Sequence, residues 1–185
     1  MMNAYKIVFS GPVGTGKTTA IGAISDIEPF QTEEFATDEV KDIKENTTVA
    51  MDYGMMKLDN DDRIHLYGTP GQDRFDFMWE ILTEGGIGLI LLMNNNDKDP
   101  LKECEKYLDA FSDYIKSTGV SIGVSRMEIN STPTIDDYHE LLKSRNISAP
   151  IIEVDPREAD DVILLLESLL YSIDPGLSQE DEAVA

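Results

Sequence analysis

The residues from 11 to 19 have the types and the spacing that bind the phosphates of a nucleotide. They fit the pattern G-x-x-x-x-G-K-[ST], with Gly11, Gly16, Lys17 and Thr18 at the fixed positions. Glycines let backbone N–H groups turn towards phosphate oxygens, the lysine reaches the outer phosphates, and the threonine hydroxyl binds a magnesium ion. The phosphate-binding residues predicted on this basis are Gly11, Val13, Gly14, Thr15, Gly16, Lys17, Thr18 and Thr19.

The flanking residues give this loop the setting that the pattern requires. Residues 5–9 form a short run of β-branched and aromatic side chains, which is typical of a strand, and residues 20–24 can continue a helix. A glycine-rich turn that binds nothing is the competing interpretation. The filled fixed positions and the order strand, loop, helix favour a phosphate site.

Strands and helices alternate along the rest of the chain. Beyond the strand at 5–9 and a first helix at 17–26, strands are predicted at 47–58, 63–67, 86–93, 120–124 and 151–154, and helices at 74–82, 100–116, 134–144 and 159–173. This order predicts an α/β fold of the P-loop NTPase kind. We expect a mostly parallel six-stranded sheet with one antiparallel edge strand and helices on both faces.

The chain is expected to form one domain from residue 1 to 173, followed by an acidic, disordered tail at 174–185. Residues 28–46 are polar and acidic without clean periodicity, so they are predicted to form a long, mobile loop. Ligands of such sheets bind at the carboxyl ends of the strands, where the phosphate loop and the later loops should converge.

Charge and cysteine content narrow the class of protein. The net charge of −21 opposes binding to nucleic acid and to anionic membrane surfaces. The chain has a single cysteine, Cys104, which excludes an internal disulfide and whose spacing predicts a core position. No signal peptide, membrane span or lipid-anchor motif is recognised, so a cytoplasmic location is expected.

Three spaced motifs make the chain similar to the Ras-like small GTPases, over nearly its whole length up to Ile173. The first is the phosphate loop, the second is Thr-Thr-Val-Ala-Met-Asp-Tyr at 47–53, and the third is Gly-Thr-Pro-Gly-Gln-Asp-Arg-Phe at 68–75. The resemblance implies a Ras-like G domain that binds GTP or GDP with Mg²⁺ and hydrolyses GTP to GDP and phosphate, weakly on its own.

The resemblance also implies roles for residues of the second and third motifs. Thr48, with Thr47 as the alternative, would bind magnesium together with Thr18 and sense the third phosphate. Gly71 would offer its N–H to that phosphate, and Gln72 would orient the attacking water. The catalytic residues implied are therefore Gln72, Lys17 and Thr48.

More narrowly, residues 66–75 with Met78 and Trp79 resemble the prokaryotic branch, the conservon-type and gliding-motility-type GTPases. In that branch, partners of roadblock type act on the switch regions. The resemblance thus implies a roadblock-type regulator or a GTPase-activating protein as the partner. Gly68 stands where most Ras-like proteins carry an aspartate near the magnesium ion, and the prokaryotic branch lacks that aspartate too.

The base-binding part of the family pattern is the most altered. Ser125, Arg126 and Glu128 stand in place of Asn-Lys-x-Asp, so Glu128 is the expected acceptor for guanine and the Arg126 stem is expected over the base. The run Asn94 to Asp97 is an alternative, but it follows an earlier strand and is better explained as a loop and helix entry. The segment after the last strand, 155–157, reads Asp-Pro-Arg, where backbone N–H groups can serve.

The function predicted first is a nucleotide-dependent molecular switch with slow GTP hydrolysis that a partner stimulates. Its two switch regions are predicted at 30–56 and 68–83, which would change conformation according to whether a third phosphate is present. Two alternatives stay open: a P-loop ATPase or kinase that acts on a small substrate, and a binding module that holds a nucleotide without hydrolysing it.

Overall fold

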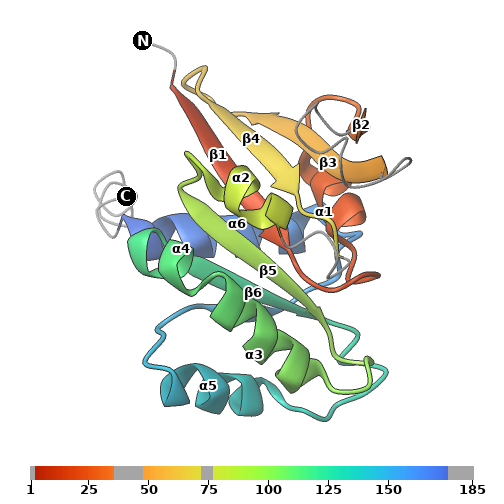
Figure 1. Cartoon of the computed structure of the whole chain (residues 1–185), viewed down its shortest axis with the longest axis vertical. Coiled ribbons are helices and arrows are strands. Elements are labelled where there is room, and N and C mark those ends of the chain that lie inside the picture. The colour runs from red at the N-terminus through yellow and green to blue at the C-terminus, as the bar shows by residue number, and fades with distance from the viewer. Residues whose placement is uncertain (1–2, 36–47, 72–76, 175–185) are drawn as a thin grey trace, which may run out of the picture.

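A computed structural model describes residues 3–35, 48–71 and 77–174 of the chain (Figure 1). The strands are β1 (Ala4–Ser10), β2 (Phe30–Phe35), β3 (Thr48–Lys57), β4 (Arg63–Gly68), β5 (Gly88–Asn94), β6 (Val120–Ser125) and β7 (Ile151–Glu153). The helices are α1 (Lys17–Ile24), α2 (Phe77–Thr83), α3 (Pro100–Ala110), α4 (Ser112–Ser117), α5 (Ile135–Ser144) and α6 (Ala159–Ile173).

All the described strands form one sheet with the order β2-β3-β4-β1-β5-β6-β7. Strand β1 lies between β4 and β5 and is parallel to both, and β5, β6 and β7 continue the parallel arrangement. Strand β3 alone runs against the others, because it pairs antiparallel with both β2 and β4. The predicted α/β class, with a mostly parallel sheet and one antiparallel strand, is confirmed. The prediction that this strand lies at the edge is wrong, because β2 pairs with the outer side of β3.

The sheet has seven strands, one more than predicted, because β2 adds an edge strand outside β3. Its residues, 30–35, fall inside the segment 28–46 that the sequence indicated as a loop, so that prediction is wrong for this part. The segment carries two glutamates among six residues, and charged side chains are common on edge strands, where they oppose further pairing. The polar composition of residues 30–35 therefore indicated a loop although these residues form the edge strand β2. Residues 36–46 and the predicted tail at 175–185 lie outside the described residues.

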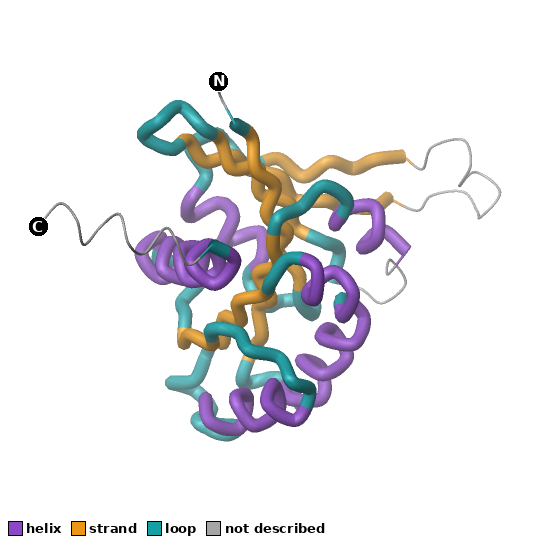
Figure 2. The backbone as a smooth tube through the Cα atoms, turned by 90° about the vertical axis from the view of Figure 1, so that its left-hand side faces the viewer, coloured by secondary structure: helices purple, strands orange, loops and turns teal. Residues whose placement is uncertain are grey.

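Helices cover both faces of the sheet and enclose two apolar cores (Figure 2). On one face, α1 and α6 pack against β1, β4 and β5, with Leu165 and Leu169 fully buried. On the other face, α3 and α5 pack with Trp79 of α2, and Cys104 is fully buried there as predicted. Burial raises the pKa of the Cys104 thiol to about 12, which keeps it uncharged.

The helix predicted over 100–116 is divided at Phe111 into α3 and α4. Phe111 leaves the helical conformation, with φ −98° and ψ 14°, and its ring is buried against Trp79 at a centroid distance of 5.0 Å. The other helix ends follow the sequence closely: Asp99 caps α3, and Thr134 and Asp137 form a capping box at α5.

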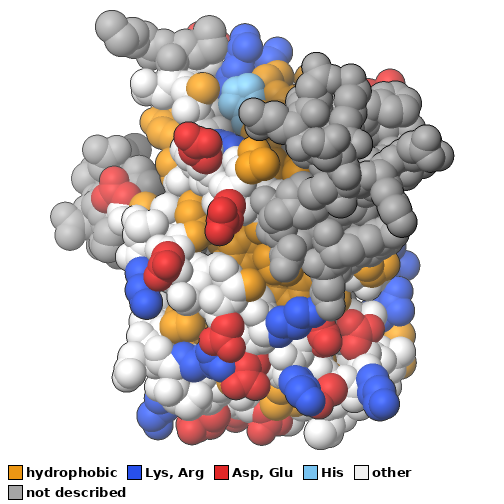
Figure 3. Space-filling view, viewed as in Figure 1, with side chains coloured by type: hydrophobic (Ala, Val, Ile, Leu, Met, Phe, Trp, Pro, Cys, Tyr) orange, Lys and Arg blue, Asp and Glu red, His pale blue; other side chains and the backbone are white. Residues whose placement is uncertain are grey.

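Charged side chains of both signs alternate over the lower part of the view in Figure 3, where α3 and α5 lie. Arg145, which follows α5, forms ion pairs with Glu105 and Asp109 of α3 and so links these two helices. Within the described ranges, no helix is both long enough and apolar enough to cross a membrane.

Candidate functional site

The phosphate loop follows β1 and ends at the first turn of α1, as its sequence predicts. Gly11, Gly14 and Gly16 have φ values of 141°, 79° and 93°, a region that side chains disfavour. Any Cβ at Gly11 would lie 2.1 Å from the carbonyl oxygen of Leu92, and one at Gly16 would lie 2.8 Å from Pro156. The loop thus needs glycine both for its backbone conformation and for close contact with neighbouring segments.

Lys17 turns its side chain back over this loop. Its Nζ donates to the carbonyl oxygens of Gly11 and Pro12, at 2.7 Å each, and only 8% of the residue is exposed. Burial lowers the pKa of Lys17 to about 8, an effect that the nearby Asp52 carboxylate partly offsets. The Lys17 ammonium is therefore largely removed from water, which strengthens its electrostatic attraction for an anion bound beside it.

Asp52 of β3 is a site residue that the sequence analysis missed. Its Oδ2 accepts a hydrogen bond of 2.6 Å from the hydroxyl of Thr18, the predicted magnesium ligand. Asp52 lies directly opposite Gly68 in the ladder between β3 and β4. A Cβ at Gly68 would come within 3.1 Å of the Asp52 Oδ2, so the glycine makes room for this carboxylate.

A signal for Asp52 was present in the sequence. The hairpin between β3 and β4 turns at 58–62, and counting outward from this turn pairs residue 52 with residue 68. Gly68 occupies the position at which most Ras-like proteins carry an aspartate. The register shows that a carboxylate reaches the same region from the neighbouring strand.

The segment after β4 lies against the phosphate loop. A Cβ at Gly71 would lie 2.7 Å from the backbone nitrogen of Val13 and 2.9 Å from Lys17 Nζ. Gly71 is therefore in close contact with the loop, beside Lys17, the lysine predicted to reach the outer phosphates. The structure brings this predicted residue into the site.

A pocket of about 360 Å³ joins the phosphate loop to the loops that follow β6 and β7. Its lining residues are Gly14, Thr15, Gly16, Thr19, Ser125, Arg126, Glu128, Ile129, Val154, Asp155, Pro156 and Arg157. All three predicted base-binding residues therefore share one pocket with the phosphate loop. The segment 155–157 completes its wall, as expected for the loop after the last strand.

The two carboxylates of this pocket have different surroundings. Asp155 accepts hydrogen bonds from the Arg157 guanidinium and backbone, which lower the pKa of Asp155 to about 2. Glu128 has no hydrogen-bond partner within the described part of the chain, and Arg157 interacts with it only through its charge. The described residues therefore leave the hydrogen-bonding capacity of the Glu128 carboxylate unused.

The run from Asn94 to Asp97 is structural, as the sequence analysis favoured. Asn95 is fully buried, and its amide donates to the carbonyl oxygens of Asn130 and Pro133 at 2.6 and 2.9 Å. Its Oδ1 accepts from the Tyr138 hydroxyl at 3.0 Å. Asn95 therefore anchors the loop that carries Arg126 and Glu128.

Two predicted catalytic residues have side chains outside the described part. Thr48 is the first residue of β3 and pairs with Phe35 of β2, but nothing is described of its side chain. Gln72 lies in the segment 72–76, which is outside the described residues. Their roles stay predictions.

Comparisons with known proteins agree with this geometry. The model of a family described as "conserved hypothetical ATP binding protein" matches residues 9–169. An uncharacterized protein of Methanocaldococcus jannaschii is 29% identical over 134 residues, which cover 72% of this chain and 77% of the relative. The Ras-related protein RabC of Dictyostelium discoideum is 21% identical over 187 residues, covering 97% and 88%. These relationships support a nucleotide-binding P-loop protein related to the Ras-like proteins.

The lowered pKa of Lys17 predicts a pH dependence of nucleotide binding. A bound phosphate chain favours the charged lysine, so affinity should be constant below pH 8 and fall by up to about tenfold per pH unit above it. Equilibrium titration with a nucleoside triphosphate from pH 7 to 9 measures this. Lys17→Arg stays charged over that range and should give a flat profile. An equally steep decline in Lys17→Arg would contradict the assignment to Lys17.

Proposed function

This chain belongs to the family described as conserved hypothetical ATP binding proteins, and we propose that this member is a guanine-nucleotide switch. In this proposal it binds GTP and hydrolyses it slowly. One observation carries the proposal: residues of the phosphate loop and Glu128 line the same pocket. The phosphates and the base of one nucleotide can therefore be bound together.

The chemistry of Glu128 favours guanine over adenine. Guanine presents two donors side by side, N1–H and the N2 amino group, and an ionised carboxylate is an acceptor with two oxygens. Adenine presents N1 as an acceptor in the corresponding place, so a carboxylate there would face a lone pair. A site built to accept hydrogen bonds discriminates strongly against a ligand that lacks the donors.

The family description favours an adenine nucleotide, so a P-loop ATPase or kinase is the second candidate. The Arg126 side chain lines the same pocket and can stack on either base. The arrangement of the phosphate loop does not discriminate between the bases. Selectivity for guanine or adenine therefore depends on the predicted base-binding residues Ser125, Arg126 and Glu128.

We further propose that Asp52 takes part in holding the magnesium ion that accompanies the nucleotide. Among the described residues, no group of three His, Cys, Asp or Glu side chains could hold a metal alone, and in the proposed site water and the phosphates would supply the remaining ligands. The Thr18 hydroxyl and the Asp52 carboxylate already lie 2.6 Å apart, and both are oxygen ligands of the kind magnesium prefers. Thr48 is also a predicted ligand, but it lies four residues before Asp52 on the extended strand β3, roughly 13 Å away along the strand. We therefore propose that Thr48 joins the same ion only when the start of β3 moves towards Thr18.

Both predicted switch regions, 30–56 and 68–83, already contact the phosphate loop. Asp52 of the first bonds to Thr18, and Gly71 of the second lies beside Lys17. A third phosphate would act on both contacts, which is how nucleotide-driven switches sense their state. We propose that Gln72 orients the attacking water and that a roadblock-type regulator or GTPase-activating protein stimulates hydrolysis through these segments.

Base selectivity tests the proposed function first. Competition binding should give an affinity for GTP and GDP at least about a hundredfold above that for ATP. Glu128→Gln should weaken GTP and improve XTP, because an amide can donate to the xanthine oxygen that replaces the guanine amino group. The control is Glu140→Gln on α5, which should change neither. Equal affinity for ATP and GTP in the unmodified chain would contradict the guanine assignment.

Asp52→Asn tests the magnesium proposal. Removing the charge while keeping the shape should reduce the stabilisation of bound nucleotide by magnesium by about tenfold, since partners of metal ligands typically contribute this much. The measurement is the dissociation rate of a fluorescent GDP with magnesium and with a chelator. Asp59→Asn, in the exposed turn of the same hairpin, removes the same charge and should leave the ratio unchanged. An unchanged ratio in Asp52→Asn would exclude the role.

Single-turnover hydrolysis tests Gln72. Gln72→Ala should slow hydrolysis of bound GTP by about tenfold or more, with nucleotide affinity changed little, because the lost interaction orients water only in the reaction. Gln179→Ala in the C-terminal segment is the matched control. A roadblock-type partner, if added, should accelerate the parent chain and not Gln72→Ala. Hydrolysis that is absent from the parent chain would instead support the non-hydrolysing binding module.

A further inference from the structure

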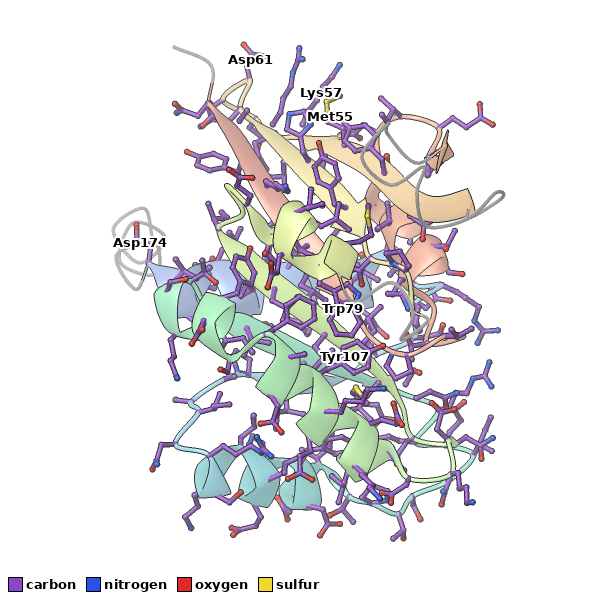
Figure 4. All side chains as sticks on the ribbon, viewed as in Figure 1. Met55, Lys57, Asp61, Trp79, Tyr107 and Asp174 are labelled. Carbon is purple, nitrogen blue, oxygen red and sulfur yellow. The ribbon has the colours of Figure 1, made fainter. Side chains whose placement is uncertain are left out.

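Two buried aromatic side chains donate to the backbone beside the phosphate loop. Trp79 Nε1 of α2 donates to the carbonyl oxygen of Pro70 at 3.3 Å, and the Tyr107 hydroxyl of α3 donates to the carbonyl oxygen of Gly71 at 3.4 Å. Figure 4 shows both side chains between α2 and α3, in front of the sheet. The carbonyl groups of Pro70 and of Gly71, which lies beside Lys17, are thus both hydrogen-bonded by aromatic side chains of the α2 and α3 layer.

These donors are held in place by a compact aromatic cluster. The ring centroids of Trp79 lie 5.1 Å from Tyr107 and 5.0 Å from Phe111. The three residues are 6%, 1% and 3% exposed, so their rings have little freedom to move independently. A displacement of the Gly71 carbonyl would therefore have to break a hydrogen bond or shift the cluster.

The start of the segment is tied to β1 as well. Thr69 donates its backbone N–H to the Phe9 carbonyl oxygen at 2.8 Å, and its hydroxyl bonds to the Ser10 hydroxyl at 2.7 Å in a buried position. With Thr69 fixed to β1, the Pro70 and Gly71 carbonyls decide how closely Gly71 approaches Lys17. The aromatic donors act on those carbonyls.

We propose that Tyr107 and Trp79 are positioning residues that hold Gly71 beside Lys17, and that they couple α3 to the occupant of the third-phosphate position. The proposal rests on the proposed function, because it assumes that a triphosphate binds between Gly71 and Lys17. It adds that α3, which is outside both predicted switch regions, responds to the nucleotide.

Trp79 is the sole tryptophan of the chain, so its fluorescence reports this cluster without added labels. The rings of Tyr107 and Phe111 and the Pro70 carbonyl surround it. Binding of a triphosphate and of a diphosphate should therefore give different Trp79 emission.

The test compares Tyr107→Phe with Tyr114→Phe. Tyr114 is the matched control, because its hydroxyl also donates to a backbone carbonyl, that of Gly88 at 3.2 Å, in the same helical layer but away from the phosphate loop. For each chain, the affinities for a non-hydrolysable GTP analogue and for GDP are measured, and Trp79 emission is recorded in both states.

Tyr107→Phe should lower the ratio of triphosphate to diphosphate affinity by about two- to fivefold, the effect of one long hydrogen bond, and should shrink the difference in Trp79 emission. Tyr114→Phe should change neither quantity. An unchanged ratio in Tyr107→Phe, an equal change in both variants, or identical Trp79 emission in the two states of the parent chain would each overturn the proposal. Binding of the parent chain to GTP analogue tests the proposed function separately; if ATP binds instead, the same ratio is measured with adenine nucleotides.

Discussion

The nearly buried ammonium of Lys17 is the constraint on which the rest of the site depends. A buried charge is costly unless it is paired or hydrogen-bonded, and here it is satisfied by two carbonyl oxygens of its own loop and by the nearby charge of Asp52. Those carbonyls can point inward only because the loop adopts glycine conformations. The loop, the antiparallel strand β3 and the segment around Gly71 therefore converge on one cation, which is the proposed contact for a phosphate of the nucleotide.

The carboxylate that contacts Thr18 comes from β3 and not from the end of β4, where Ras-like proteins usually carry an aspartate. With Gly68 at the end of β4, the oxygen that meets Thr18 is supplied by Asp52 of the adjacent strand. Asp52 thereby connects the proposed magnesium position to β3, which pairs with β2 at the sheet edge. If this strand pair moved with the nucleotide state, as the proposed switch requires, the Asp52 carboxylate would move with it.

The sequence predicted the fold well, and it predicted the place of the glycine loop between β1 and α1, because both depend on local patterns. The apolar runs of β5 and β6 and the periodicity of α6 depend on burial, and the phosphate loop depends on glycines at fixed spacing. The features that the sequence did not predict all depend on contacts between residues far apart in the chain. Strand β2 is too polar to be recognised without its partner β3, the break at Phe111 depends on its contact with Trp79, and Asp52 acquires its role only through the register with Gly68. The base end was predicted in position, since Ser125, Arg126 and Glu128 all line the pocket.

We propose that one nucleotide spans the phosphate loop and the Glu128 pocket, with its third phosphate between Lys17 and Gly71. The decisive measurement is a crystal structure of the chain with magnesium and a non-hydrolysable GTP analogue. We expect hydrogen bonds from guanine N1 and N2 to the Glu128 carboxylate, Lys17 Nζ on the outer phosphates, and the Asp52 carboxylate next to the magnesium ion. A base bound outside this pocket, or a third phosphate that does not contact Lys17, would contradict it.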